Sequence, residues 1–406
     1  MARQTAEYRG CVGREVVMGV LKQIAAVTLL TLQGVPQRLG SSLVIVVGMA
    51  AVVAVVISVL SMSSGFLESV NKTGRADRAI VTNSGAITES LSSLPRETIR
   101  VIIDAPGVKR GGDGKAVVSA DIFAYQPVTK KSDGLLIYAT IHGIGAEAFV
   151  LLPQIKLLSG RMFKPGLREM IVGKMMQSQL EGLQVGSNIP LPDGDWSVVG
   201  SFESDGDQHE SELLGDAETL MSSFRRTSFN SATVMLDSPG AFDIFKDALS
   251  TNPAVSVDVT RETVYFAKLS KPLNDFLTLV AFAVGGIMGL GAVFGALNTM
   301  YSAISVRTTE IATLRAIGFG GVAVVVSVFA EALVLTLLGA ALGACLAWAL
   351  FSGIVVVSDY YIYTLVVKPS LIALGIVWAV LTGVVGGLFP AIRAASLPVA
   401  TALRGI

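Results

Sequence analysis

The feature that most constrains this fold is a run of 21 residues without a charged side chain, residues 42–62. At ~1.5 Å per residue, a helix of this length just spans the ~30 Å hydrocarbon core of a bilayer. The run starts too late and is too long for a cleaved secretory signal. Five basic residues precede it, so we expect a signal anchor whose N-terminus stays inside; they are Arg3, Arg9, Arg14, Lys22 and Arg38.

Composition agrees with a membrane protein. Of the 406 residues, 52% are hydrophobic and 15% are charged, whereas soluble proteins average about 25% charged. The net charge of zero argues against a nucleic-acid partner. Cys11 and Cys345 lie in different regions and offer no disulfide framework, and the two histidines, His142 and His209, leave little material for a catalytic or metal cluster. We therefore expect no catalytic residue, no metal site and no bound cofactor.

Three further apolar runs follow, at residues 275–300, 321–351 and 371–391. The tail, residues 392–406, carries Arg393 and Arg404 and no acid, so it is expected inside. Four spans with both termini in the cytoplasm satisfy these charges. This arrangement leaves residues 301–320 in the cytoplasm and residues 352–370 as a short loop outside.

Residues 63–274 have the character of a soluble α+β domain, which must then lie outside the cytoplasm. β-Branched and aromatic residues, turn signals and two prolines predict its elements. The expected strands are 78–83, 116–125, 135–141, 187–191, 196–202 and 255–259, with helices after Pro95 and at 241–249. Before the first span, residues 1–41 hold an amphipathic helix, which either lies along the inner membrane face or packs on the membrane bundle.

Two segments of the outer domain resemble known binding loops, but each lacks a residue that such a loop requires. The sequence G-G-D-G-K at 111–115 lacks the first Gly and the Ser/Thr of a phosphate loop. The acid-rich segment 203–218 has Glu210 where a calcium loop needs Gly. We interpret this segment as a solvated loop that runs into a helix.

The stretch 304–319 is a short charged segment between two long apolar runs. Treated as one helix, it places two arginines among bulky apolar residues on one face, namely Ile304, Arg307, Ile311, Leu314 and Arg315; its other face carries small residues. Such a mixed face suits docking onto another protein, although a cytoplasmic loop with positive-inside charges is the alternative. Gly318 is expected to cap the helix.

Polar and small residues also mark the spans. The second span carries two pairs of glycines four residues apart, Gly285 with Gly289 and Gly291 with Gly295. Small residues at this spacing let helices approach closely, so these glycines indicate a dimer interface. The alternative is a span that is merely rich in glycine. Glu331 is ionisable and lies well inside a span, where a carboxylate must be paired or neutralised. We favour a structural polar clamp over a proton relay, with Asn298, Thr299 and Ser302 as candidate partners.

This order of elements resembles the permease subunits of the MacB/FtsX-like (type VII) ABC transporters, which include lipoprotein-releasing permeases. The resemblance is sharpest at V-R-T-T-E-I-A-T-L-R-A-I-G (306–318). The closing stretch F-P-A-I-R-A-A-S-L-P-V-A-T-A-L-R (389–404) also resembles the C-terminal motif of the family. The resemblance implies that 306–318 is the coupling helix that docks on the ATPase. The contact set would be Arg307, Glu310, Ile311, Leu314, Arg315, Ala316 and Gly318, with Ile311 and Leu314 as the knob.

The resemblance implies a non-catalytic subunit in the bacterial inner membrane, paired with a second permease copy or a paralogue. Because the chain has no Walker A motif, ATP and Mg²⁺ are expected on a separate ABC ATPase, whose closure would move the periplasmic domain by mechanotransmission. The substrate would be a lipoprotein, a peptide or a hydrophobic compound, with or without a periplasmic adaptor. The alternative is an FtsX-like transducer that activates a periplasmic cell-wall hydrolase, although such transducers tend to have smaller outer domains.

Overall fold

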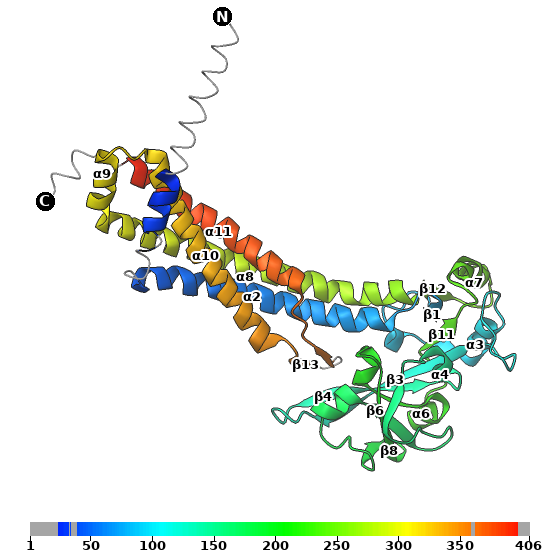
Figure 1. Ribbon diagram of the computed structural model, residues 1–406. Coiled ribbons are helices and arrows are strands. Elements are labelled where there is room, and N and C mark those ends of the chain that lie inside the picture. The colour runs from blue at the N-terminus through cyan, green and yellow to red at the C-terminus, as the bar shows by residue number, and fades with distance from the viewer. Residues whose placement is uncertain (1–22, 32, 34–38, 359–361, 397–406) are drawn as a thin grey trace, which may run out of the picture. The chain divides into compact units, whose positions relative to one another are not determined.

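The computed structural model describes residues 23–31, 33, 39–358 and 362–396. Within them, four helices are long and apolar enough to cross a membrane: α2 (Leu39–Thr73), α8 (Glu262–Val306), α10 (Gly321–Phe351) and α11 (Pro369–Ser396) (Figure 1). The four expected spans are thus confirmed. The chain divides into two compact units. The first holds Met1–Met62, Phe276–Ser352 and Val366–Ile406, and the second holds Ser63–Asp275 and Gly353–Leu365.

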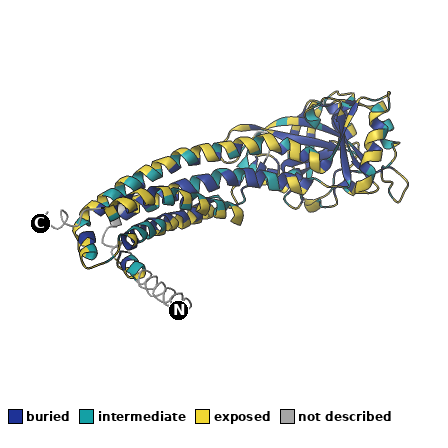
Figure 2. Cartoon of the chain, turned by 90° about the horizontal axis from the view of Figure 1, so that it is seen from above, coloured by how far each residue is buried: buried dark blue, intermediate teal, exposed yellow. Residues whose placement is uncertain are grey.

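Small residues set the close packing of the helical unit. A Cβ at Gly339 or Gly343 of α10 would lie 2.6 Å from the Val46 carbonyl oxygen or 2.4 Å from that of Ala50, both on α2. On α11, a Cβ at Gly383 would lie 2.5 Å from the Thr336 hydroxyl of α10. The absence of a side chain at these glycines lets α10 approach the backbone of α2, and α11 approach the Thr336 side chain. Large apolar side chains are instead exposed along these helices, and Figure 2 shows that each long helix carries many exposed residues.

The second unit is built on a ten-stranded mixed sheet in the order β12-β1-β11-β3-β4-β9-β6-β8-β5, with β7 paired to β8 (Figure 1). β4 and β9 run parallel, as do β6 and β8. The strands are β1 (Arg78–Asn83), β3 (Val118–Thr129), β4 (Leu136–Ile144), β5 (Lys156–Gly160), β6 (Glu169–Gly173), β7 (Asn188–Leu191), β8 (Gly194–Glu203), β9 (Glu212–Asp216), β11 (Ser231–Met235) and β12 (Val257–Arg261).

Short helices and two small ribbons complete this unit. The ribbons pair β2 (Leu94–Pro95) with β10 (Ser228–Phe229), and β13 (Val355–Val357) with β14 (Ile362–Thr364). The helices are α3 (Arg96–Ile103), α4 (Ala148–Leu151), α5 (Lys174–Gln179), α6 (Ala217–Ser223) and α7 (Phe242–Ser250), with 3₁₀ turns η2 (Glu89–Leu91), η3 (Gln208–Ser211) and η4 (Pro239–Ala241). The sheet is mostly buried in Figure 2, and Trp196, 0% exposed, lies in its core.

Most expected elements of this unit form, with shifted ends. The strand expected at 78–83 is β1, and the hairpin expected between 187 and 202 is β7 with β8. The G-G-D-G-K segment is a tight turn in which the Gly111 amide donates to the Lys115 carbonyl at 2.7 Å.

The segment 352–370, expected as a short loop outside, contains a small β-ribbon. It forms β13 and β14, and the Ser211 hydroxyl donates to the Ile362 carbonyl at 2.7 Å. The β-branched residues of β13 and β14, together with Tyr363, suit paired strands.

The acid-rich segment 203–218 runs into a helix, α6, as expected, but the part before the helix is not a solvated loop. It forms η3 and β9, and some of its carboxylates accept backbone N–H groups. Glu210 accepts from Ser204 at 2.8 Å and from Gly206 at 2.9 Å, and Asp216 caps α6 by accepting from Thr219 at 3.1 Å. Charges that look solvated in the sequence are here used to satisfy buried backbone donors.

The helix expected near the N-terminus is described only from residue 23. Residues 23–31 are helical, with Val27 and Thr31 buried and Leu29 and Leu30 exposed. The Thr31 hydroxyl lies 3.1 Å from that of Ser327 on α10. Of the two alternatives, the described part therefore packs on the bundle. The earlier part of this helix, and the tail after residue 396, lie outside the described residues.

Candidate functional site

The charged stretch after the second membrane helix is two helices and not one. α8 ends at Val306, Arg307 sits between with φ −97° and ψ 7°, and α9 covers Thr308–Ala316. The expected cap is confirmed: Gly318 has φ 109°, its amide donates to the Arg315 carbonyl, and the Phe319 amide donates to that of Leu314. This pair of bonds is a Schellman motif, which ends α9 sharply.

Arg307 joins α9 to α10. Its Nη1 atom lies 3.3 Å from Oε2 of Glu331, and its Nε atom lies 3.2 Å from Oε2 of Glu310. The Arg307 and Glu331 side chains are 14% and 7% exposed. A carboxylate that far inside a helical bundle needs an opposite charge. Glu331 therefore acts as an anchor for the residue that begins α9.

Arg315 joins α9 to α11. Its Nη1 atom donates to the Ala395 carbonyl at 2.9 Å, near the end of α11. Carbonyl groups in the last turn of a helix have no partner within the helix, and a cation there also meets the negative end of the helix dipole. Both arginines of the expected docking face thus bind the bundle of their own chain.

The isoleucines of the expected docking face also point into the bundle. The face that carries Ile304 and Ile311 is therefore not the exposed one, contrary to the expectation. Ile304 and Ile311 are each 6% exposed and pack with Val324, Val328 and Ala394. The bundle needs bulky apolar contacts as much as a partner would, so the sequence pattern alone does not separate the two uses. Ile311 is therefore not available to a partner in this structure.

The opposite side of this segment is open. Val306 and Ile317 are 80% and 72% exposed, and four of the residues between them are also exposed, namely Thr309, Glu310, Thr313 and Ala316, whereas Ala312 is buried. We call these six exposed residues the outer face of α9. Of the expected contact set, Glu310, Ala316 and the capping residue Gly318 are exposed, whereas Leu314 is half-buried.

The glycines of α8 divide between two environments. A Cβ at Gly285 would lie 2.6 Å from Val56 of α2, and one at Gly289 would lie 3.3 Å from the Trp378 indole nitrogen of α11. Gly291 and Gly295 have nothing within 4 Å of such a Cβ. The first two therefore pack inside the chain, and the last two are free for another helix.

Asn298 does not lie inside the bundle as expected for a partner of Glu331, since it is exposed on α8. The Thr299 hydroxyl, another candidate, donates to the Gly295 carbonyl at 2.7 Å within its own helix. The carboxylate of Glu331 pairs with Arg307 instead.

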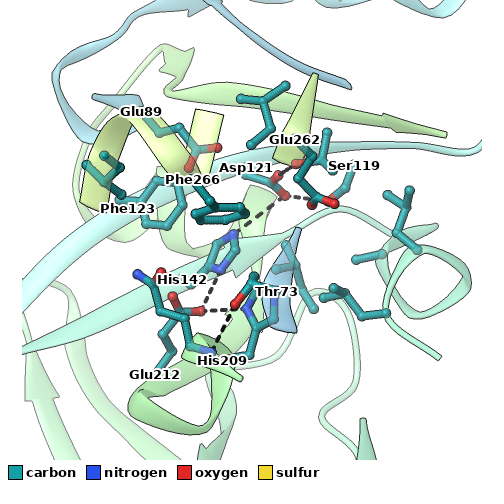
Figure 3. Close-up of a pocket in the computed structure, with 18 residues that line it drawn as sticks. Thr73, Glu89, Ser119, Asp121, Phe123, His142, His209, Glu212, Glu262 and Phe266 are labelled. Atoms are coloured by element: carbon teal, nitrogen blue, oxygen red, sulfur yellow. Dashed lines mark hydrogen bonds and ion pairs between the residues drawn. The ribbon is translucent and has the colours of Figure 1, made fainter. Parts of the chain in front are cut away.

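A second polar cluster, in the sheet unit, was missed by the sequence analysis. The Nδ1 atoms of His142 and His209 lie 2.9 and 3.0 Å from the same oxygen of Glu212 (Figure 3). The two histidines are 67 residues apart, so only the parallel pairing of β4 with β9 brings them together. The available signal was the position of His142 directly after the expected strand 135–141 and of His209 within the acid-rich segment.

Opposite charges shift the pKa values within this cluster. Burial alone would lower the pKa of His142, but the carboxylates of Glu212 and Asp121 outweigh it and raise the pKa to about 10. Burial alone would raise the pKa of Glu212, but the two histidines hold it at about 2. Burial would lower the pKa of His209 as well, and the charges of Asp207 and Glu212 raise it.

Comparison with known proteins gives two family matches. The model of the MacB-like periplasmic core domain matches residues 40–252, slightly more than half of the chain, and that of the FtsX-like permease C-terminal region matches residues 282–399. The uncharacterized ABC transporter permease YknZ of Bacillus subtilis (strain 168) is 23% identical over 291 residues, which cover 66% of this chain and 70% of the relative.

Two solved structures also match the sheet unit. The periplasmic region of MacB from Actinobacillus actinomycetemcomitans has a TM-score of 0.37 at 13% identity, covering 50% of this chain and 97% of that structure. The extracellular domain of the noncanonic ABC-type transporter YknZ from Gram-positive bacteria has a TM-score of 0.32 at 19% identity, covering 45% and 99%. On the family matches, this chain belongs to the MacB/FtsX-like family of ABC transporter permeases.

Proposed function

We propose that this chain is the transmembrane subunit of an ABC transporter in the bacterial inner membrane and that α9 receives the motion of a separate ATPase subunit. ATP and Mg²⁺ would be bound by that ATPase, and both termini of this chain would face the cytoplasm. The observation that carries the proposal is the two-sided character of α9. One side is fixed to α10 and α11 through Arg307 and Arg315, and the outer face is exposed.

The outer face of α9 has the make-up of a docking surface. Val306 and Ile317 are large, apolar and mostly exposed, in a segment that also carries Arg307, Glu310 and Arg315. Exposed apolar anchors surrounded by polar residues are typical of protein interfaces. The small residues between them, Thr309, Thr313 and Ala316, let a partner surface approach the helix backbone closely.

Movement of α9 would reach the outer domain through continuous helices. α8 runs without interruption from Glu262 to Val306 and follows β12 directly. At its start, Glu262 accepts the Arg75 amide at 2.7 Å and pairs with the buried guanidinium of Arg78 on β1 at 3.6 Å. We propose that this helix carries mechanical force from the ATPase to the sheet unit, so that a substrate is moved from the periplasm or the outer leaflet.

A second permease copy would bind the open side of α8. Gly291, Gly295 and Asn298 are spaced at i, i+4 and i+7 and therefore share one face. An amide exposed to lipid is unfavourable, and small residues four apart permit close helix contact. We propose that these three residues lie at a dimer interface. Gly285 and Gly289, which the sequence also suggested, pack inside the chain instead.

Co-purification tests the ATPase assignment. The chain is co-expressed with the ABC ATPase encoded beside it, and the complex is recovered through a tag on the ATPase. We expect Ile317→Asp to abolish recovery. The matched control is Ile87→Asp, which places the same charge at an 83% exposed isoleucine in the sheet unit. Recovery of Ile317→Asp at the control level would contradict the proposal.

A further inference from the structure

Three buried side chains of the sheet unit converge on one point. His142 lies on β4, Glu212 begins β9, and His209 lies in η3 just before it. They are 6%, 5% and 8% exposed. One ligand atom from each lies within 4.8 Å of those of the other two. In Figure 3 the imidazole rings of His142 and His209 both lie next to the Glu212 carboxylate.

We propose that these three residues bind one divalent transition-metal ion, with Zn²⁺ preferred. Two imidazoles and one carboxylate form a donor set that suits Zn²⁺. Zn–N and Zn–O bonds of about 2.0–2.2 Å in tetrahedral geometry place ligand atoms about 3.3 Å apart. The separations of 2.9 Å from His142 to Glu212 and 3.0 Å from His209 to Glu212 are a few tenths of an ångström shorter. A small outward shift of the rings would admit the ion.

The surroundings of His142 have the form of an outer ligand shell. Its Nε2 atom is buried and has no hydrogen-bond partner among the described residues. A carboxylate oxygen, Oδ1 of Asp121, lies 3.8 Å away from this atom. Asp121 is itself held by the Thr233 hydroxyl at 2.9 Å and by the Ser119 hydroxyl. Histidines that bind metals through one nitrogen usually donate the other to a carboxylate. The same shift of the ring toward Asp121 would complete that bond.

The cluster also has room for a further ligand. It borders a cavity of about 60 Å³, and a water needs only about 10–15 Å³ of such volume. Gln208 lines this cavity, and its Oε1 atom is buried without a hydrogen-bond donor among the described residues. A metal-bound water would supply that donor. The ligand shell is then three protein atoms and one water.

The three ligands come from separate elements, β4, β9 and η3. The metal would connect η3 to β4 and β9 and so fix the acid-rich segment on the sheet. This role is independent of ATPase docking, because none of the residues involved lies on α9. The inference therefore stands or falls apart from the proposed function.

Cobalt substitution tests the site in the full-length protein. The chain is purified in detergent through a histidine-free tag, stripped with a chelator and titrated with Co²⁺. We expect one equivalent to produce the visible d–d bands of tetrahedral Co²⁺ without a thiolate charge-transfer band, and one equivalent of Zn²⁺ to displace it. Absence of these bands in the wild-type protein would overturn the proposal without any variant.

Three variants assign the ligands. His142→Gln, His209→Gln and Glu212→Gln should each lower the affinity for Co²⁺ at least tenfold, with circular dichroism used to check that each protein is folded. The control, Asp205→Asn, changes an exposed acid in the same segment and should bind like the wild type. Equal binding by a folded histidine variant and the control would refute the site.

Discussion

The Arg307 guanidinium lies 3.3 Å from the Glu331 carboxylate, so the residue that begins α9 is tied to a buried acid of α10. The sequence alone suggests unrelated roles for the two residues, a docking clamp and a polar group inside the membrane. The two residues instead form one ion pair, which holds α9 against the bundle. The outer face of α9 stays exposed.

Removing one member of this pair should cost more stability than removing both. Glu331→Leu leaves a buried guanidinium without its partner in α10, and we expect a loss of about 3 kcal/mol. The double variant Arg307→Met/Glu331→Leu should recover most of that loss, because no buried charge is left. Thermal unfolding in detergent measures both proteins. Glu310→Gln, at a 66% exposed partner of Arg307, is the control and should change stability by less than about 0.5 kcal/mol.

Close helix packing predicts that Gly343→Ala is destabilising. The added methyl would lie 2.4 Å from the Ala50 carbonyl oxygen, so α2 and α10 must separate. We expect a loss of about 1–3 kcal/mol in thermal unfolding. Gly286→Ala places the same methyl on α8 with nothing within 4 Å and should not destabilise the protein. Equal stability of the two variants would show that the α2–α10 contact is looser than described.

The proposed dimer predicts position-dependent effects on α8. Gly291→Leu should abolish chemical cross-linking between two permease copies, because the larger side chain keeps the helices apart. Gly286→Leu adds the same bulk at another open position of the same helix and should cross-link like the wild type. Undiminished cross-linking of Gly291→Leu would place the interface elsewhere.

Glu89 predicts a pH dependence of stability. Withdrawal of its carboxyl from water raises the pKa from about 4.5 to about 7. The folded state therefore holds a proton that the unfolded state releases, so this contribution to stability is complete below about pH 4.5 and is lost as the pH rises through 7. Glu89→Gln should reduce the fall in Tm between pH 5 and pH 8, measured with chelator present. The exposed Glu181→Gln should leave that fall unchanged.

Much of this fold can be predicted from the sequence because the elements concerned depend on residues that are neighbours in the chain. The uncharged run at 42–62 predicts a span by its length alone, and Gly318 predicts a cap because few other residues adopt its φ of 109°. The strand at 78–83 follows from its β-branched residues, which suit a pleated surface.

The site depended on contacts between distant segments, which composition does not reveal. Ile311 and the two arginines suit a partner surface and the bundle equally well. Only the burial of Ile311 and the contacts of the arginines with Glu331 and Ala395 separate the two uses. Glu210 and Asp216 look solvated until the backbone donors that they satisfy are known. His142 and His209 meet only because β4 and β9 are parallel neighbours.

Site-specific photo-cross-linking tests the central claim, that the outer face of α9 contacts the ATPase. A photoreactive amino acid is placed at Ile317, which is 72% exposed, or at Ile311, which is 6% exposed, and the chain is co-expressed with the neighbouring ATPase. We predict cross-links to the ATPase from position 317 and none from position 311. Cross-links from position 311 with none from position 317 would contradict the account.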